Sequence, residues 1–213
     1  MDDFFDIKDF RSITPILEFA SKKQKYIYDI DNILFANTGR LDALSSNQFF
    51  SEAGQMLINA IMLFEQGYFD CAFYSMRQSL ELSITTLFIT ANDEGIKSWD
   101  KSESGFEKGR MLNFLKENET VFKDVREKMD IFFQKIRGTT MAIDKYVHKQ
   151  GFKTFYSARK SFDGQKEYHN KELLFDFEEY LKDCIGAVAI YRLAIDPLPV
   201  LLMDSMFIEK LGL

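Results

Sequence analysis

Hydrophobic residues recur every three or four positions along most of this 213-residue chain. Spacing of this kind places apolar side chains on one face of an α-helix, whereas a half-buried strand would alternate apolar and polar residues. Proline, which breaks helix interiors, occurs only at positions 15, 197 and 199. We therefore predict an all-α protein, an antiparallel up-down bundle of four to five long helices with short additional helices.

Local start and stop signals place the expected helices. Thr14 and Pro15 suit an N-cap and a first turn, and Gly39 suits the break after that helix. The five long helices are expected at residues 15–37, 46–66, 68–92, 119–148 and 171–195. We predict a single globular domain, in which an N-terminal helical segment of residues 1–45 packs on a bundle formed by residues 46–213.

The expected helix at residues 68–92 is apolar on nearly all sides, and beyond Cys71 its only charged residues are Arg77 and Glu81. A helix of this kind is typically central and buried. Arg77 and Glu81 are four residues apart and can form an ion pair, which a buried charge requires. We interpret them as a structural polar pair. The alternative is a polar pocket between helices, facing Arg137, in which they bind a small ligand.

Composition and charge narrow the range of functions. The formal charge of −6 argues against nonselective coating of nucleic acid, although it leaves room for a local basic site. Cys71 and Cys184 both lie in apolar helical context, which is typical of buried thiols in a reducing compartment. The acidic N-terminus does not resemble a signal peptide, and Arg192 and Asp196 interrupt the most apolar C-terminal stretch. We expect a cytoplasmic protein with no membrane partner.

Candidate chemistry lies in the expected helix at residues 119–148. At about 100° per residue, Asp144 and His148 fall within about 20° of Arg137, on a stripe about 100° from the core position Ile136. Arg137, Asp144 and His148 could form a catalytic group, with histidine as general acid or base beside a bound phosphate. His148 could instead interact with the C-terminal end of the helix dipole, just before Gly151 ends the helix. Both interpretations remain open.

The segment that follows, residues 149–171, is basic, with a formal balance of +4 in an otherwise acidic chain. The nucleic-acid-binding candidates in it are Lys149, Lys153, Arg159, Lys160 and Lys166. Phenylalanines and tyrosines alternate with these cations, an arrangement that can hold a phosphate backbone while bases stack. A solvated loop whose aromatic residues anchor it to the bundle has the same composition, so this role also stays open.

Several signatures of enzymes are absent from the sequence. It contains no glycine-rich phosphate loop, no zinc-ligand spacing of cysteine and histidine, and no serine in a nucleophile elbow. We expect neither a metal nor a cofactor. Hydrolase, kinase and dehydrogenase functions therefore have no motif to support them.

Two stretches, "EQGYFDCAFYSMRQSLELSITTLFI" and "KIRGTTMAIDKYVHKQGF", resemble the HEPN-like helical bundle superfamily of bacteria, over roughly residues 46–195. The resemblance implies an up-down bundle, commonly a homodimer, often attached to toxin–antitoxin or phage-defence systems. Catalytic members cleave RNA without a metal, using an arginine and a following histidine at a dimer cleft. Those positions correspond here to Arg137 and His148, which have ten residues between them, more than the family spacing.

We therefore expect a bacterial stress or phage-defence protein that acts mainly through association with a second copy or with a protein partner such as an antitoxin. One alternative is a metal-independent endoribonuclease that acts on RNA through Arg137, Asp144 and His148. Another is a small-ligand sensor with its pocket near Arg77 and Glu81. The sequence does not decide whether the protein is an enzyme.

Overall fold

The computed structural model describes residues 19, 21–91, 126–155, 166–196, 198–199, 205 and 209. The long helices are α2 (Lys23–Phe35), α3 (Leu44–Glu65), α4 (Phe69–Ala91), α7 (Arg126–Val147) and α9 (Lys166–Ile195). Two short 3-10 helices, η2 (Leu41–Ala43) and η4 (Phe152–Thr154), lie in the connections. The described part of the chain contains no strand. The prediction of an all-α protein is confirmed.

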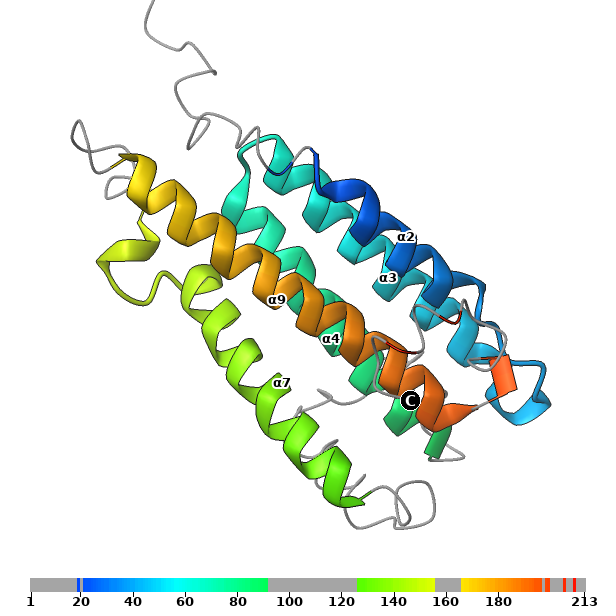
Figure 1. Ribbon diagram of the computed structural model, residues 1–213. Helices are drawn as coiled ribbons and strands as arrows, with labels where there is room; N and C mark the ends of the chain where they lie inside the picture. The colour runs from blue at the N-terminus through cyan, green and yellow to red at the C-terminus, as the bar shows by residue number, and fades with distance from the viewer. Residues whose placement is uncertain are drawn as a thin grey trace, which may run out of the picture.

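The long helices run in alternating directions along the chain (Figure 1). The Lys23 Nζ atom at the start of α2 lies 2.7 Å from a carboxylate oxygen of Glu65 at the end of α3, so these helices are antiparallel. Near the other end, Arg192 of α9 donates to the carbonyl of Ile33 in α2, so α2 and α9 run the same way. The predicted up-down topology is confirmed.

Helix α4 occupies the middle of the bundle and packs on α3, α7 and α9. Its buried core face includes Phe69, Ala72, Phe73, Met76, Leu80 and Leu87. Phe64 and Phe177 stack at its side with ring centroids 3.7 Å apart, and Phe19 meets both edge-on. Helix α2 contributes Ile30 and Ile33 to the same core. The central placement of this helix follows from its apolar surface on several sides.

Some boundaries differ from the sequence-based expectation. Helix α9 begins at Lys166, five residues before the predicted start, and the first helix ends at Phe35 instead of residue 37. The predicted start at Thr14 and Pro15 lies outside the described residues, as do residues 119–125. The expectation that both cysteines are buried is wrong for Cys71, which is exposed on the side of α4 away from the core.

Two helices end in the same hydrogen-bonded motif but with different residues. After α3, Gly67 has a φ of 85° and the Tyr68 N–H donates to the Leu63 carbonyl at 2.8 Å. This closes the helix in the way glycine favours, as predicted. After α7 the corresponding left-handed residue is Lys149, with a φ of 54°. The prediction that Gly151 ends this helix is therefore wrong, because the turn already forms at Lys149.

Candidate functional site

Helix α7 lies on the flank of the bundle (Figure 1). Polar contacts fix its inner side against α9. The Thr139 hydroxyl donates to Asp183 at 2.7 Å, and the ammonium of Lys135 lies 2.5 Å from the other oxygen of that carboxylate. In the last turn of the helix, the Tyr146 hydroxyl donates to Asp176 at 2.7 Å. These contacts determine which side of α7 faces outward.

A second set of charges connects α7 to α4. Arg77 and Glu81 form the predicted ion pair, with 3.0 Å between the guanidinium and the carboxylate. The sequence did not indicate that Arg77 also contacts Asp144 of α7, at 2.9 Å between Nε and Oδ1. This contact is an ion pair without the alignment of a hydrogen bond. Arg77 is 25% exposed, so the cluster lies at a seam between the helices and is only partly buried.

The cluster bears on two of the sequence-based hypotheses. Asp144 was a member of the candidate catalytic group with Arg137 and His148, but its carboxylate faces Arg77 on α4. Glu81 also accepts a hydrogen bond from the Gln78 amide at 3.2 Å. The polar groups that a small ligand would need near Arg77 and Glu81 are therefore largely bound to one another.

Four exposed side chains, Arg137, Met141 and Lys145 of α7 and the adjoining His148, share one side of the described part of this helix, which we call its outer face. Within the described part of the chain, none of the three basic residues has an ion pair or a side-chain hydrogen bond. Met141 is 59% exposed at the centre of this face. The structure thus exposes Arg137 and His148 on one line, as the helical spacing predicts.

Distance along the helix limits what Arg137 and His148 can do together. They are eleven residues apart in the numbering, and a rise of 1.5 Å per residue separates their backbones by about 16 Å along the helix axis. His148 follows the last helical residue, and its N–H donates to the Asp144 carbonyl at 2.8 Å. At that separation, two side chains of one chain do not meet on a single phosphate.

Among the predicted nucleic-acid-binding residues, only Lys149 has a described side chain. Its ammonium forms an ion pair with Asp70 in the first turn of α4 and donates to the Thr154 carbonyl at 3.1 Å. The ammonium of Lys149 is therefore already paired within the protein. Arg159 and Lys160 lie outside the described residues, and Lys153 and Lys166 are described by their backbone alone.

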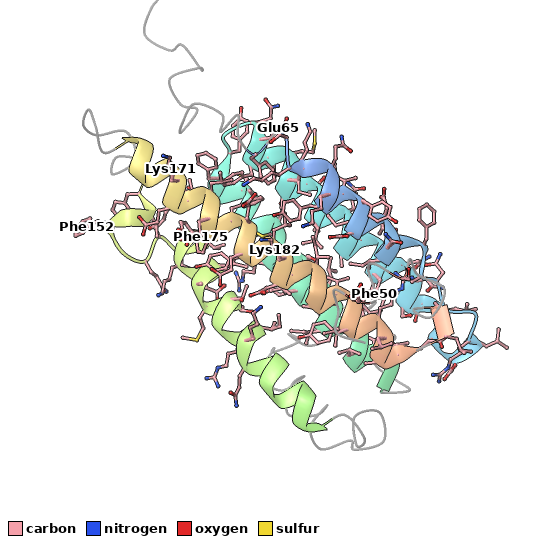
Figure 2. The ribbon with its side chains drawn as sticks, viewed as in Figure 1. Phe50, Glu65, Phe152, Lys171, Phe175 and Lys182 are labelled. Carbon is pink, nitrogen blue, oxygen red and sulfur yellow. The ribbon has the colours of Figure 1, made fainter. Side chains whose placement is uncertain are left out.

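The contacts of Lys149 hold a short aromatic turn, residues 151–155, against the first turn of α4. Within it the Thr154 hydroxyl donates to the Gly151 carbonyl at 2.8 Å, and the Phe155 N–H donates to the Phe152 carbonyl at 3.0 Å. The two phenylalanine rings meet edge-to-face with centroids 5.7 Å apart. Figure 2 shows Phe152 projecting away from the bundle at this end of the molecule.

The largest polar network that sequence reasoning missed lies at the opposite end, around Arg192 of α9. This residue is 3% exposed and donates to the Ile33 carbonyl at 2.6 Å, to the Ala36 carbonyl, and to the Asn37 side chain at 2.5 Å. Its guanidinium carbon lies 5.2 Å from the centre of the Phe50 ring. Burial lowers the pKa of Arg192 to about 10. Arg192 thus caps the C-terminal end of α2 with a positive charge.

The turn between α2 and α3 completes this network. The Thr38 hydroxyl donates to Asp196, and the Thr38 backbone exchanges two 2.9 Å hydrogen bonds with the Asn47 side chain. Arg40 donates to the Ile195 carbonyl at 2.8 Å. The signal in the sequence was a pair of charges, Arg192 and Asp196, in an otherwise apolar stretch. Buried charges need partners, and here those partners make the network structural.

Other classes of site find no support in the described residues. No three of the His, Cys, Asp and Glu residues in these segments are grouped to hold a metal ion. No helix in the same segments is long and apolar enough to cross a membrane. Comparisons with protein-family models, with curated proteins and with solved structures found no match. The assignment of a function therefore rests on the geometry of α7 and of the turn after it.

Proposed function

We propose that this protein is a HEPN-like helical bundle of a bacterial stress or phage-defence system, and that it acts by associating with a second copy or with a partner protein. The observation that carries the proposal is the outer face of α7. Its inner side is bound to α4 and α9 through Asp144 and Asp183. The basic residues of its outer face contact no other described side chain by ion pair or hydrogen bond.

The composition of the outer face suits a protein contact. Methionine and arginine are enriched in protein interfaces, and both occur here, as Met141 and Arg137. Beside them, Gly138 has no heavy atom within 4 Å of the position that a Cβ would take. A second helix can therefore approach α7 closely at this point. Two copies of α7, crossing antiparallel around Ala142, would form an isologous interface.

The same crossing supports the second candidate, a metal-independent endoribonuclease. Arg137 and His148 lie at nearly equal distances on either side of Ala142 along α7. An antiparallel pair therefore brings Arg137 of one copy near the partner's His148, at each end of the contact. The guanidinium would bind a phosphate of RNA, and the imidazole would act as the general acid or base of the cleavage reaction.

Self-association is tested by measuring the molar mass of the wild type and of Met141→Asp with light scattering after size-exclusion chromatography. We expect a dimer for the wild type and a monomer for Met141→Asp, because the new carboxylate would be buried at the centre of the contact. Met62→Asp is the matched control, since Met62 is an exposed methionine of α3. Equal dissociation of both variants, or a wild type that is monomeric and captures no partner, would contradict the proposal.

The ribonuclease candidate has a sharper test, based on mixed dimers. Arg137→Ala and His148→Ala should each be inactive alone in the presence of a metal chelator. Mixing them re-forms one intact Arg137–His148 pair in half of the dimers, so about a quarter of the wild-type activity should return. A mixture that stays inactive beside an active wild type would show that the two residues do not act across a dimer.

A further inference from the structure

Four aspartates take part in the contacts that connect α7 and the turn after it to the rest of the bundle. Two of them belong to α9. Asp183 accepts a hydrogen bond from the Thr139 hydroxyl at 2.7 Å and lies 2.5 Å from the ammonium of Lys135. Asp176 accepts a hydrogen bond from the Tyr146 hydroxyl at 2.7 Å. The side of α7 that faces α9 is therefore attached through carboxylates.

The other two aspartates connect α7 and its turn to α4. Asp144 of α7 pairs with Arg77 at 2.9 Å, and Lys149, just after the helix, pairs with Asp70. The side chains of Arg77 and Lys149 are 25% and 36% exposed, so dissolved ions reach both pairs. Ion pairs of this exposure are weakened by salt. Charge thus fastens α7 along most of the length over which its side chains are described.

Apolar burial contributes less to α7 than to its neighbours. Between residues 134 and 147, its buried apolar side chains are Ile136 and Ile143. The buried positions between them are Thr139 and Thr140, which carry hydroxyl groups. Helix α3 in comparison buries four large apolar side chains completely, namely Phe50, Leu57, Ile61 and Phe64. Because apolar burial is the main force that holds helices together, α7 depends on its polar contacts more than α3 does.

The sequence of α7 also disfavours a helix that stands alone. Gly138, Thr139 and Thr140 are consecutive residues in it, and all three have low helix propensity. Most of the stability of a helix in a protein comes from packing against its neighbours. A release of α7 from α4 and α9 would therefore also unfold the helix.

We propose that α7 is a charge-controlled element, which detaches and unfolds as a unit while α2, α3, α4 and α9 stay folded. Proteins open locally in cooperative units, and a unit with few buried apolar contacts opens at the lowest free energy. Here the four carboxylates set that free energy, so raised ionic strength or the loss of one carboxylate favours the detached state. Detachment would disperse the outer face of α7. This regulatory consequence rests on the proposed function, whereas detachment itself does not.

The test is native-state hydrogen exchange, measured by mass spectrometry on peptides from each helix. In the wild type, amides of α7 should exchange about tenfold faster than those of α3 and α4, or faster still. Asp183→Asn removes a charge with little change of shape. It should speed the exchange of α7 by a further factor of about 5 to 30, the value of one charge-assisted hydrogen bond and one partly exposed ion pair.

Asp196→Asn is the matched control for Asp183→Asn. Asp196 is buried to a similar degree and also accepts a hydrogen bond from a threonine, Thr38, but it lies at the turn between α2 and α3. The exchange of α7 should be the same in Asp196→Asn as in the wild type, because the contacts of α7 are intact in both.

Ionic strength provides a second measurement, which needs no substitution and decides the matter if Asp183→Asn does not fold. Raising the concentration of KCl from about 0.1 M to about 1 M shortens the Debye length from about 10 Å to about 3 Å. The exchange of α7 should become about 3- to 30-fold faster as its three ion pairs are screened, while the exchange of α3 and α4 stays the same.

Two results would overturn the proposal. One is exchange of α7 at the same rate as α3 and α4 in both the wild type and Met141→Asp, since the latter lacks any protection from a dimer contact. The other is equal acceleration of α7 by Asp183→Asn and Asp196→Asn. Early opening of α7 in Met141→Asp but not in the wild type would support detachment and self-association together. Early opening in a monomeric wild type would support detachment and refute self-association.

Discussion

Arg192 and Arg137 are both helical arginines, and they lie in opposite surroundings. Arg192 of α9 is buried among the carbonyls that end α2, where it donates to Ile33, Ala36 and Asn37. Arg137 of α7 is exposed and has no ion pair among the described residues. The sequence alone made Arg137 the candidate for chemistry and treated Arg192 as an interruption of an apolar stretch.

The difference lies in what faces each side chain. The end of α2 leaves carbonyl groups without partners inside the helix, and a guanidinium can bind several of them at once. Within the described segments, no acceptor bonds to the exposed basic side chains of α7. Its anchoring contacts in these segments come from Lys135, Thr139, Asp144 and Tyr146. One arginine therefore stabilises the fold, and the other makes no ion pair with the described residues.

The largest expected effect is a loss of stability when the buried network around Arg192 is broken. Arg192→Ala should lower the free energy of unfolding by about 2–6 kcal/mol, because two buried carbonyls lose their donor at about 1–3 kcal/mol each. The free energy of unfolding of Arg192→Lys should lie between those of the wild type and Arg192→Ala, since one ammonium cannot reproduce the forked contacts of the guanidinium. Arg137→Ala should stay within about 0.5 kcal/mol of the wild type. Urea unfolding measures the stability of all three variants. Similar losses for Arg192→Ala and Arg137→Ala would show that the two arginines do not differ in their contribution to the fold.

A smaller effect is expected at the seam between α4 and α7. Because Arg77 is partly exposed and has two acidic partners, Glu81→Ala should cost about 0.2–1 kcal/mol. A fully buried pair, as the sequence indicated, would cost about 3–5 kcal/mol. Asp144→Ala should cost more than Glu81→Ala, since it also releases α7 from α4. A loss of about 3–5 kcal/mol for Glu81→Ala would show that the seam between α4 and α7 is as buried as the surroundings of Arg192.

At alkaline pH, a further effect is expected at the contact between α2 and α9. Burial, followed by the carboxylate of Glu178, raises the pKa of Tyr26 to about 12 from about 10. The folded state then holds the phenol proton where the unfolded state has lost it. This contribution to stability is complete below about pH 10 and is lost as the pH rises toward 12.

Unfolding of Tyr26→Phe across that pH range should therefore show a shallower decline than the wild type. Comparing the two proteins isolates the tyrosine from Arg192, whose lowered pKa acts in the opposite direction over the same range. Tyr28→Phe is the control, because Tyr28 is exposed on the same helix. Identical slopes for the wild type and Tyr26→Phe would show that the α2–α9 contact is open to solvent.

Much of the fold could be predicted because its signals are local. The apolar period located five helices, Gly67 marked the end of one of them, and the spacing of Arg77 and Glu81 predicted their ion pair. Each of these depends on residues within a few positions of one another, and the geometry of a helix turn relates them directly. The exposure of Arg137 and His148 on one line belongs to the same class.

By itself, the sequence determined the helical class, the approximate helix boundaries and the residues that share each face, because a 3.6-residue period is a property of neighbouring positions. Only the tertiary structure decided that Asp144 binds Arg77, that Lys149 binds Asp70 and that Arg192 caps α2. These contacts join residues 67 to 159 positions apart. Which charge is satisfied and which remains free depends on the register between helices, and that register is set by the packing of the whole core.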